Sequence, residues 1–469
     1  MFTDRLTVHF EKSITTSPVG FCLYWMQQSQ RINYNHALAY AIELSNEYKL
    51  PLLVYFGLTD DFPEANERHY AFMLEGLNEV SKELQKRGIG FHLVKASPEV
   101  GITDYIRNAA FLVMDKGYLK IQRKWREKVI KKALTTEVLG VYELESDLIV
   151  PIGMTSVKEE YAARTIRPKI HRYLDQYALN FRMKSVIIPW SGEWFEALDN
   201  QLYPKAIHNL NPKMIDEFLE SAAIDHSVKK SLYFKGGYSN ALLRLHAFIE
   251  KGLPHYDEGN SPAFVVQSGL SPYLHFGQIS ALEIYLTLQK VKHIRNEAYN
   301  GFIEQLIVRR ELAFNFVYYR EGYDVFETMT NPWAYRTMGL HDDDVRPYLY
   351  DVEVLEKFAT HDTYWNTAMK EMVLTGYMHN YMRMYWCKKI IEWTPNFKKA
   401  YETAIYLNNK YFIDGRDPNS YTGVAWCFGI HDRGWRERSI FGTLRYMNAQ
   451  GLKRKFDMKK YIERIDKLI

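Results

Sequence analysis

Between Gly20 and about Glu145 the sequence alternates short apolar runs with longer amphipathic segments, and this alternation restricts the fold more than any other feature of the chain. Short apolar runs are typical of the buried strands of a parallel sheet, and amphipathic segments between them are typical of crossover helices. The pattern predicts βαβ units and a mostly parallel, Rossmann-like sheet. The expected strands are Phe21–Trp25, Pro51–Phe56, Gly90–Val94, Ala110–Met114 and Val138–Tyr142, and the clearest helical segments are Asn35–Tyr48 and Arg68–Arg87.

No Gly-x-Gly-x-x-Gly sequence follows the first expected strand. In dehydrogenases those glycines let the backbone approach a dinucleotide pyrophosphate at a helix N-terminus. The sequence therefore gives no support to a nucleotide-dependent dehydrogenase.

The chain divides into two parts of different pattern. Residues 1–189 are expected to form the α/β domain, and from Gly236 the pattern is helical almost throughout, which predicts an all-α domain at 236–469. Residues 190–235 mix Pro, Asn and acidic groups with little periodicity, so we expect a linker there. A length of 469 residues is ample for two domains, each with its own core.

The cysteine and charge content excludes several classes of protein. Cys22, Cys387 and Cys427 are widely separated and have neither metal-ligand nor disulfide spacing, which favours a reducing compartment and predicts no metal site. No apolar run is long enough to span a bilayer. We therefore expect a soluble, cytoplasmic monomer without a membrane partner. The net charge of +4 restricts any nucleic-acid surface to a local basic patch.

The segment from His361 to Arg445 contains a helical face of unusual composition. A continuous helix would hold Trp365 about 31 Å from Trp386, at about 1.5 Å per residue, whereas a break at Thr375-Gly376 would let them lie side by side. Such a row could carry electrons between solvent and a buried redox cofactor, or its aromatics could simply fill a helical core. Steps of four and three residues define the face, whose members are Trp365, Met369, Met372, Gly376, His379, Arg383, Trp386, Ile390 and Trp393.

The sequence Asp414-Gly415-Arg416-Asp417-Pro418 predicts a turn that is dense in ionisable groups. Apolar sequence flanks it on both sides, including Val424-Ala425-Trp426. Charges in such a setting must be paired or must bind something polar, so this turn is a candidate part of a site.

These motifs together resemble the FAD domain of class II cyclobutane pyrimidine dimer photolyases. The resemblance extends along almost the whole chain and implies a light-dependent lyase that uses FAD to reverse cyclobutane pyrimidine dimers in UV-damaged DNA. It also implies that the N-terminal domain is the holder of an antenna chromophore, and no motif decides whether this chain binds a deazaflavin, a folate or nothing. The matching segments are 378–386, 414–418, 431–438 and 451–457, with 160–169 as the passage out of the antenna domain.

One loop would hold the flavin phosphates. Ser271 is a good N-cap and Pro272 suits the first helical position, which by themselves indicate no more than the start of a helix. By resemblance, Ser268, Leu270 and Ser271 match the flavin-phosphate loop, and Tyr256 matches a tyrosine that contacts the flavin.

The resemblance also implies which charged residues surround the cofactor. Arg310 matches an arginine that faces the flavin and pairs with the aspartate of the turn, here Asp414. Arg383, Arg416 and Asp417 are the other expected cofactor-binding residues. From the residues alone, Arg310 and its charged neighbours in an apolar helix are most simply an ion-paired structural element.

Asn408 matches the class II asparagine near flavin N5, with Asn409 as its competitor. In other photolyase classes this asparagine lies six residues after the aspartate of the turn, where this chain has Ser420. The departure favours class II.

A further group of residues would contact the pyrimidine dimer. Met384 and Trp426 match positions that pack against it, although both could fill a core. Asn380 matches a polar contact, at a position where class II members often carry Gly. Glu304 is the best match to a glutamate that contacts the dimer, and Glu311 is the fallback.

The tryptophans and basic residues have roles outside the dimer pocket. By resemblance, Trp386, Trp365 and Trp393 form the electron-transfer chain in that order outward from the flavin, and His379 is either a core residue or a flavin contact. Basic residues near the pocket would contact DNA phosphates or would merely solubilise the C-terminal helix. They are Arg433, Lys453, Arg454 and Lys455.

Two other classes of protein compete with the lyase. A cryptochrome-like photoreceptor would use the same scaffold without repair, but Met384, Trp426 and the short segment after Asp457 favour the lyase. A flavin-free helical protein that binds nucleic acid would leave the charged turn at 414–418 unexplained.

Overall fold

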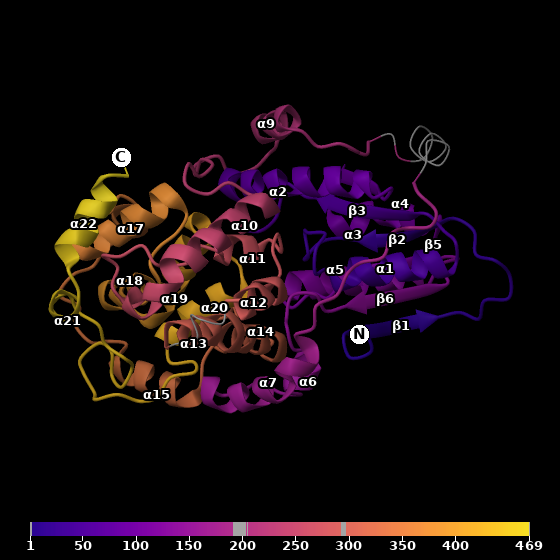
Figure 1. The fold of residues 1–469 in the computed structure, drawn as a ribbon. Coiled ribbons are helices and arrows are strands. Elements are labelled where there is room, and N and C mark those ends of the chain that lie inside the picture. Colours follow the sequence, from indigo (N-terminus) through magenta and orange to yellow (C-terminus); the bar gives the residue numbers. More distant parts are fainter. Residues whose placement is uncertain (1, 191–202, 204, 292–296, 469) are drawn as a thin grey trace.

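The structure, a computed structural model, describes residues 2–190, 203, 205–291 and 297–468. An α/β half and a helical half lie side by side, in indigo to magenta and in pink to yellow respectively (Figure 1). The predicted fold class, an α/β domain followed by an all-α domain, is therefore confirmed.

A six-stranded sheet forms the centre of the α/β half, in the order β1-β6-β5-β2-β3-β4. All neighbouring pairs are parallel except β1 with β6, which is antiparallel. The five predicted strands are present within two residues of their expected bounds. The strands are β1 (Leu6–Glu11), β2 (Phe21–Trp25), β3 (Leu52–Leu58), β4 (Gly90–Lys95), β5 (Ala109–Asp115) and β6 (Gly140–Leu144).

Helices cover both faces of the sheet. Every residue of β2, β3 and β5 is therefore buried, whichever face its side chain is on. On one face, α1 (His36–Glu47) and α2 (Glu67–Lys86) pack against the side chains of Cys22 and Tyr24. On the other, α4 (Thr103–Ile106) and α5 (Lys120–Ala133) pack against Leu23 and Trp25, with α3 (Pro98–Gly101) beside them. Alternate residues of each strand thus serve two separate cores.

The predicted linker at 190–235 lies partly outside the described residues, which omit 191–202 and 204. Its described part contains a helix that the sequence pattern did not predict, α9 (Pro212–Ser221). Ile215 and Leu219 belong to the same hydrophobic core as buried residues of α2, and Figure 1 shows α9 above that helix. Two helices, α6 (Ile152–Thr155) and α7 (Ala163–Tyr177), lead out of the sheet toward the helical half.

The C-terminal half consists of packed helices, and no helix in the described part of the chain is long and apolar enough to cross a membrane. Its α-helices are α10 (Tyr238–Ala247), α11 (Ser271–His275), α12 (Ala281–Gln289), α13 (Glu297–Ile303), α14 (Arg310–Tyr319), α15 (Pro332–His341), α16 (Val352–Glu356), α17 (Thr363–Thr375), α18 (Asn380–Trp393), α19 (Phe397–Tyr411), α20 (Pro418–Cys427), α21 (Ala449–Lys455) and α22 (Met458–Asp466). Other helical turns are η1 (Phe248–Gly252), η2 (Leu253–Asn260) and η4 (Glu304–Arg309).

The predicted break at Thr375-Gly376 separates α17 from α18. Gly376 ends α17 in the left-handed conformation, with φ of 80°, and the chain turns back so that α18 packs along α17. The indole N–H of Trp365 donates a hydrogen bond to the backbone carbonyl of Trp386 at 3.0 Å. The expectation that a folded-back pair brings these tryptophans side by side is therefore confirmed.

Polar side chains of α2 join the two halves. Arg68 donates to the carbonyls of Tyr411 at 2.9 Å and Val373 at 2.6 Å. His69 Nε2 lies 2.9 Å from the carbonyl oxygen of Phe412. These groups are buried and hydrogen-bonded, so the interface fixes the halves relative to each other.

Candidate active site

A cavity of about 400 Å³ lies within the helical half, a volume typical of ligand pockets. Its wall comes from η2, the loop before α11, η4, α14, α18, α19 and α20. Most of the predicted site residues line it: Tyr256, Ser268, Leu270, Ser271, Arg310, Asn380, Arg383, Met384, Trp386, Asn408, Asp414, Asp417 and Trp426. Segments far apart in the sequence therefore meet at one site, as the motifs predicted.

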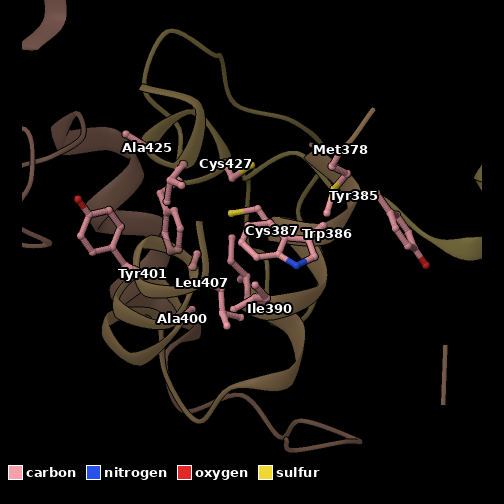
Figure 2. Packing of buried hydrophobic residues seen from close by; sticks show 14 of the residues in the cluster. Met378, Tyr385, Trp386, Cys387, Ile390, Ala400, Tyr401, Leu407, Ala425 and Cys427 are labelled. Carbon is pink, nitrogen blue, oxygen red and sulfur yellow. The ribbon is translucent and has the colours of Figure 1, made fainter. Parts of the chain in front are cut away.

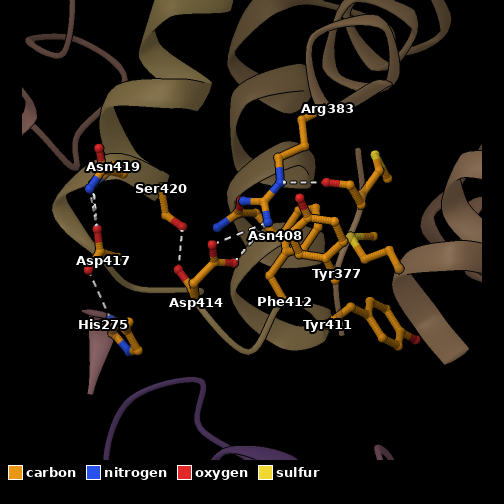
Figure 3. A network of polar contacts seen from close by, with 12 residues as sticks. His275, Tyr377, Arg383, Asn408, Tyr411, Phe412, Asp414, Asp417, Asn419 and Ser420 are labelled. Carbon is orange, nitrogen blue, oxygen red and sulfur yellow. Dashed lines mark hydrogen bonds and ion pairs between the residues drawn. The ribbon is translucent and has the colours of Figure 1, made fainter. Parts of the chain in front are cut away.

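Asp414 forms an ion pair with Arg383 and not with Arg310. Arg383 Nη2 lies 3.0 and 3.2 Å from the two carboxylate oxygens of Asp414, and its guanidinium covers the Phe412 ring at 3.9 Å (Figure 3). Arg310 instead donates to the backbone carbonyl of Asp147 at 2.8 Å. The expected pairing is wrong because α18 lies nearer to the turn, while Arg310 reaches toward the α/β half.

The second acid of the turn is held by His275. Asp417 Oδ2 lies 3.1 Å from His275 Nδ1, and Oδ1 accepts from the backbone and side-chain amides of Asn419, both at 2.8 Å (Figure 3). Burial alone would raise the pKa of Asp417, but these hydrogen bonds hold it below its usual value. Asp417 also caps α20, so it remains an anion that both positions the helix and faces the cavity.

The loop before α11 presents two hydroxyl groups to the cavity. Ser268 and Ser271 line it, and Gly269 between them has φ of +63°. Ser271 is not the N-cap that the sequence predicted: it is the first residue of α11, and Leu270 precedes the helix without a side-chain cap. The hydroxyl of Ser271 is therefore not used for capping.

The two asparagines of α19 point in different directions. Asn408 lines the cavity and donates to Asn409 Oδ1 at 2.9 Å. Asn409 faces the α/β half, where it donates to the carboxylate of Glu64 and accepts from the backbone N–H of Arg416 at 3.0 Å. The geometry favours Asn408 over its competitor.

Arg416 does not line the cavity. Its guanidinium donates to the carbonyl of Asn409 at 2.7 Å and lies 3.2 Å from His69 Nε2 at the interface between the halves. Burial lowers the pKa of Arg416 to about 10, so it stays charged at neutral pH. The prediction that Arg416 binds the cofactor is not supported by this position, since its backbone at φ 63° turns the side chain away.

Neither candidate glutamate lines the cavity. Glu304 is paired with Arg167 at 2.7 Å and Arg309 at 3.2 Å. Glu311 accepts from the backbone N–H groups of Ile149 and Val150, and burial raises its pKa to about 7. The η4 residues that do line the cavity are Gln305, Leu306 and Arg309, and the sequence pattern did not predict them as site residues.

Met384 and Trp426 form an apolar part of the wall, on α18 and α20. The Arg445 guanidinium lies 5.0 Å from the Trp426 ring and 4.1 Å from the exposed Trp435 ring, and it pairs with Asp432 at 3.0 Å. An aromatic and cationic layer thus continues from the cavity to the surface.

The predicted DNA-binding residues are all exposed. Arg433 lies over Trp435 at 5.1 Å. Lys453 and Arg454 lie on α21, and Lys455 donates to the hydroxyl of Tyr381 at 3.1 Å. They are accessible to a large partner.

The three tryptophans form a row that begins at the cavity. Trp386 lines it and lies among buried residues that include Cys387 and Ile390 (Figure 2). Trp365 is hydrogen-bonded to Trp386, and its ring centroid is 5.6 Å from that of Trp393. These contacts connect Trp386 to Trp365 and Trp365 to Trp393, and the passage of electrons in that order stays a prediction.

His379 is the N-cap of α18 and lies outside the cavity lining. Its Nδ1 accepts from the backbone N–H of Tyr381 at 3.1 Å, so Nε2 carries the hydrogen that it donates to the Gly259 carbonyl at 2.8 Å. Burial lowers the pKa of His379 to about 4, which keeps it neutral. Of the two roles left open for it, this geometry supports the structural one.

Sequence reasoning missed several residues of the cavity wall. Gln305 and Arg309 lie on η4, a π-helical turn of a kind often found at functional sites. His275 and Asn419 were missed because single polar residues carry no periodic signal. Asn419 directly follows the charged turn at 414–418, and this position in the sequence could have identified it as a site residue.

Two buried polar atoms at the cavity wall have no hydrogen-bond partner among the described residues: Trp386 Nε1 and His431 Nε2. Buried polar groups are normally paired, so unpaired ones that face a cavity indicate a polar ligand. Together with the hydroxyls of Ser268 and Ser271 and the Arg383–Asp414 pair, they suit a large ligand with both phosphate and heteroaromatic parts.

Comparisons with known proteins agree with this site. Residues 22–186 match the DNA photolyase family. The deoxyribodipyrimidine photo-lyase of Methanothermobacter thermautotrophicus is 44% identical over 95% of this chain and 94% of its own, and that of Arabidopsis thaliana is 38% identical over 96% and 90%. Cryptochromes match at 24% identity over 77% of this chain. An archaeal photolyase from Sulfolobus tokodaii, solved with two FAD molecules, has a TM-score of 0.66 at 16% identity, over 94% of this chain and 89% of that one.

An α/β half joined to a helical half with a central cavity is the fold of the photolyases and cryptochromes. At 38 to 44% identity over most of its length, the chain belongs to the DNA photolyase family. The expectation of an enzyme of the deoxyribodipyrimidine photo-lyase type is confirmed.

Proposed function

We propose that the protein repairs cyclobutane pyrimidine dimers in UV-damaged DNA and that it is a class II photolyase with FAD in the central cavity. One observation carries this proposal: four residues with different expected roles line the same cavity. They are Trp386, the first tryptophan of the row, Asn408 with its amide, and the apolar pair Met384 and Trp426. A binding protein without redox chemistry would not need a tryptophan row that ends at its ligand.

The residues of the cavity suit the parts of FAD. Ser268, Ser271 and the loop at Leu270 would hold the phosphates, and the Arg383–Asp414 pair would hold the polar edge of the flavin ring. Asn408 would lie at the flavin edge. If bound there, fully reduced and excited by light, FAD would supply the electron that opens the cyclobutane ring.

Met384 and Trp426 would receive the dimer as an apolar surface against its stacked bases, and the amide groups of Asn380 and Gln305 would contact its polar edges. A damaged pair leaves the duplex at a lower cost than an intact pair, which favours the lesion over normal DNA. Exposed basic residues near the cavity mouth would hold the backbone phosphates.

Two features support class II over other photolyase classes. Asn408 lines the cavity from α19, and Ser420, where other classes carry an asparagine, uses its hydroxyl to donate to the carbonyl of Asp414 at 2.8 Å. Of the two positions compared, the one on α19 therefore carries the amide.

A second, smaller cavity of about 100 Å³ is a candidate for the antenna chromophore. Gln28 and Thr59, which follow β2 and β3, line it together with Trp125. Ligands of parallel sheets bind beyond the carboxyl ends of the strands, so we place a deazaflavin or a folate there in this proposal.

The test is a dimer-repair assay on the purified, flavin-loaded protein. Anaerobic, dithionite-reduced enzyme is mixed with an oligonucleotide that contains a thymine dimer and is kept under blue light or in darkness. Restoration of thymines in light alone is the expected result. A bound flavin that is photoreduced without any repair would instead indicate a cryptochrome-like photoreceptor, and a folded protein without flavin would refute the proposal.

A further inference from the structure

The tryptophan row ends inside the protein. Trp386, Trp365 and Trp393 are each at most 1% exposed, so none of them contacts solvent. If the row brings electrons to the cavity, those electrons must nevertheless come from a reductant in solvent. The residues that cover Trp393 therefore decide how the row reaches the surface.

Tyr350 and His361 cover Trp393. The ring centroid of Trp393 is 5.5 Å from that of Tyr350 and 5.2 Å from that of His361, both in edge-on contact. The backbone N–H of Tyr350 also donates to the carbonyl of Trp393 at 3.0 Å, which fixes the phenol beside the indole. His361, unlike the tryptophans, is exposed.

The phenol and the imidazole are directly hydrogen-bonded to each other. The Tyr350 oxygen lies 2.8 Å from His361 Nδ1 and also accepts from the backbone N–H of His361 at 3.2 Å. The phenol oxygen accepts the backbone N–H through one lone pair, and its own O–H can be donated to Nδ1 in the imidazole tautomer whose Nδ1 carries no hydrogen. In that tautomer the imidazole presents a base to the phenol, and the His361 residue is exposed to solvent.

We propose that Tyr350 supplies the electron that refills the tryptophan row and that His361 accepts the phenolic proton in the same step. The inference rests on the proposed electron-transfer role of the tryptophans. When Trp393 has lost an electron to Trp365, one electron passes from the phenol of Tyr350 to the indole of Trp393. The phenolic O–H bond breaks, and its proton goes to Nδ1 of His361.

The step leaves Trp393 neutral, Tyr350 as a neutral phenoxyl radical and His361 as an imidazolium. A small thiol reductant in solvent then returns one electron, and the imidazolium returns the proton to Tyr350. Oxidation makes a phenol strongly acidic, so a base at 2.8 Å makes the transfer favourable. Separation of the proton from the radical slows the return of the electron to the oxidised donor.

The test is transient absorption after a light flash on the full-length, FAD-loaded protein, which follows tryptophan and tyrosine radicals separately. In the native protein the tryptophan signal should decay as the tyrosine signal rises, and the rise should slow in D₂O. Tyr350→Phe should abolish the tyrosine signal. His361→Ala should slow its rise about tenfold or more, and added imidazole should restore it.

Tyr348→Phe is the matched control, because the Tyr348 ring stacks on His361 at 3.8 Å and Phe preserves that stack. It should behave like the native protein. A second variant, His361→Gln, keeps a hydrogen-bond acceptor without a base and should be as slow as His361→Ala, and thermal unfolding of each variant verifies its folding.

A tyrosine signal that persists in Tyr350→Phe would overturn the proposal. So would a His361→Ala protein in which the tyrosine signal rises at the native rate and added imidazole does not alter that rate. Failure of the proposed function itself looks different: no tryptophan radical would then form after the flash in the native protein.

Discussion

Asn408 and Asn409 are adjacent on α19 but serve different parts of the molecule. One faces the cavity, and the other is fully buried against the α/β half. A single side-chain amide at the edge of a redox cofactor can stabilise its reduced form by a hydrogen bond, whereas an amide at a domain interface contributes to stability alone.

Replacement of Asn408 by Ala should accelerate reoxidation of the reduced flavin about tenfold, because a hydrogen bond to a charged group contributes roughly 1.5–3 kcal/mol. Stopped-flow absorbance after mixing with aerated buffer measures the rate. Asn380→Ala removes an amide from another part of the wall and should leave the rate unchanged. An unchanged rate in Asn408→Ala itself would transfer the role to Asn409.

His379 predicts a pH dependence of stability. Its pKa is about 4 in the folded protein, against about 6.5 for a free histidine, because burial disfavours the charged form. Between these values the unfolded chain binds more protons, so stability falls as the pH is lowered through this window. From pH 7 to pH 5 the loss from this residue should be about 2 kcal/mol.

Urea unfolding of the native protein and of His379→Asn at both pH values tests this expectation. Asn preserves an N-cap acceptor but does not titrate, so the variant should lose about 2 kcal/mol less than the native protein on acidification. His171→Asn, at an exposed histidine of α7, is the control and should leave the pH dependence of stability as it is in the native protein. Equal pH dependence in the native protein and His379→Asn would contradict the assignment.

At the scale of single residues, the sequence predicted which residues line the site more accurately than it predicted the contacts between those residues. Asp414 and Met384 line the cavity as expected, because each belongs to an ordered motif, and Trp426 lines it as well. The partner of Asp414 was predicted wrongly, since the distance between Arg310 and the turn depends on how α14 and α18 pack. No local pattern records that packing.

At the scale of elements, the left-handed end of α17 controls the position of the tryptophan row. Gly376 has φ of 80°, and a Cβ there would lie 2.5 Å from Ile413 Cγ1. The same turn returns the chain so that α18 runs beside α17. A change at this position therefore acts on both helices.

Gly376→Ala should destabilise the protein by about 2 kcal/mol, from left-handed strain and from the contact with Ile413. Gly339→Ala is the matched control: it lies in α15 with no heavy atom within 4 Å of an added Cβ, and it should be neutral or stabilising by up to about 1 kcal/mol. Urea unfolding measures both. A Gly376→Ala protein as stable as the native one would show that the turn adapts.

The sequence predicted five strands because their runs are buried and apolar, whereas β1 and α9 were missed. The strand β1 lies at the edge of the sheet with half-exposed side chains, so its sequence carries no continuous apolar run. The helix α9 contributes only two fully buried side chains, Ile215 and Leu219, to the core. Both elements depend on tertiary contacts more than on their own pattern.

At the scale of the whole molecule, a net charge of only +4 means that DNA must meet a local basic surface. Affinity for a dimer-containing duplex should fall steeply with salt, with a slope of about −0.9 in log–log form per phosphate contact. Fluorescence anisotropy between about 50 and 200 mM salt measures it. A flat response would argue against a phosphate-dominated surface.

Combined replacement of Lys453, Arg454 and Lys455 by Ala should reduce that slope by about 2 to 3, if each neutralises one phosphate. Lys459→Ala, on α22, is the control and should keep the native slope. An unaltered slope in the triple variant would leave these residues with a solubilising role only.

The polar contacts between the two halves limit how the chain can be divided. Arg416 and Asn409 belong to the helical half, yet their side chains are buried only because α2 and its preceding loop cover them. A separately expressed helical half would expose a guanidinium and an amide that lie directly behind the cavity wall. Shortened versions for engineering should therefore retain the sheet domain even where light harvesting is not wanted.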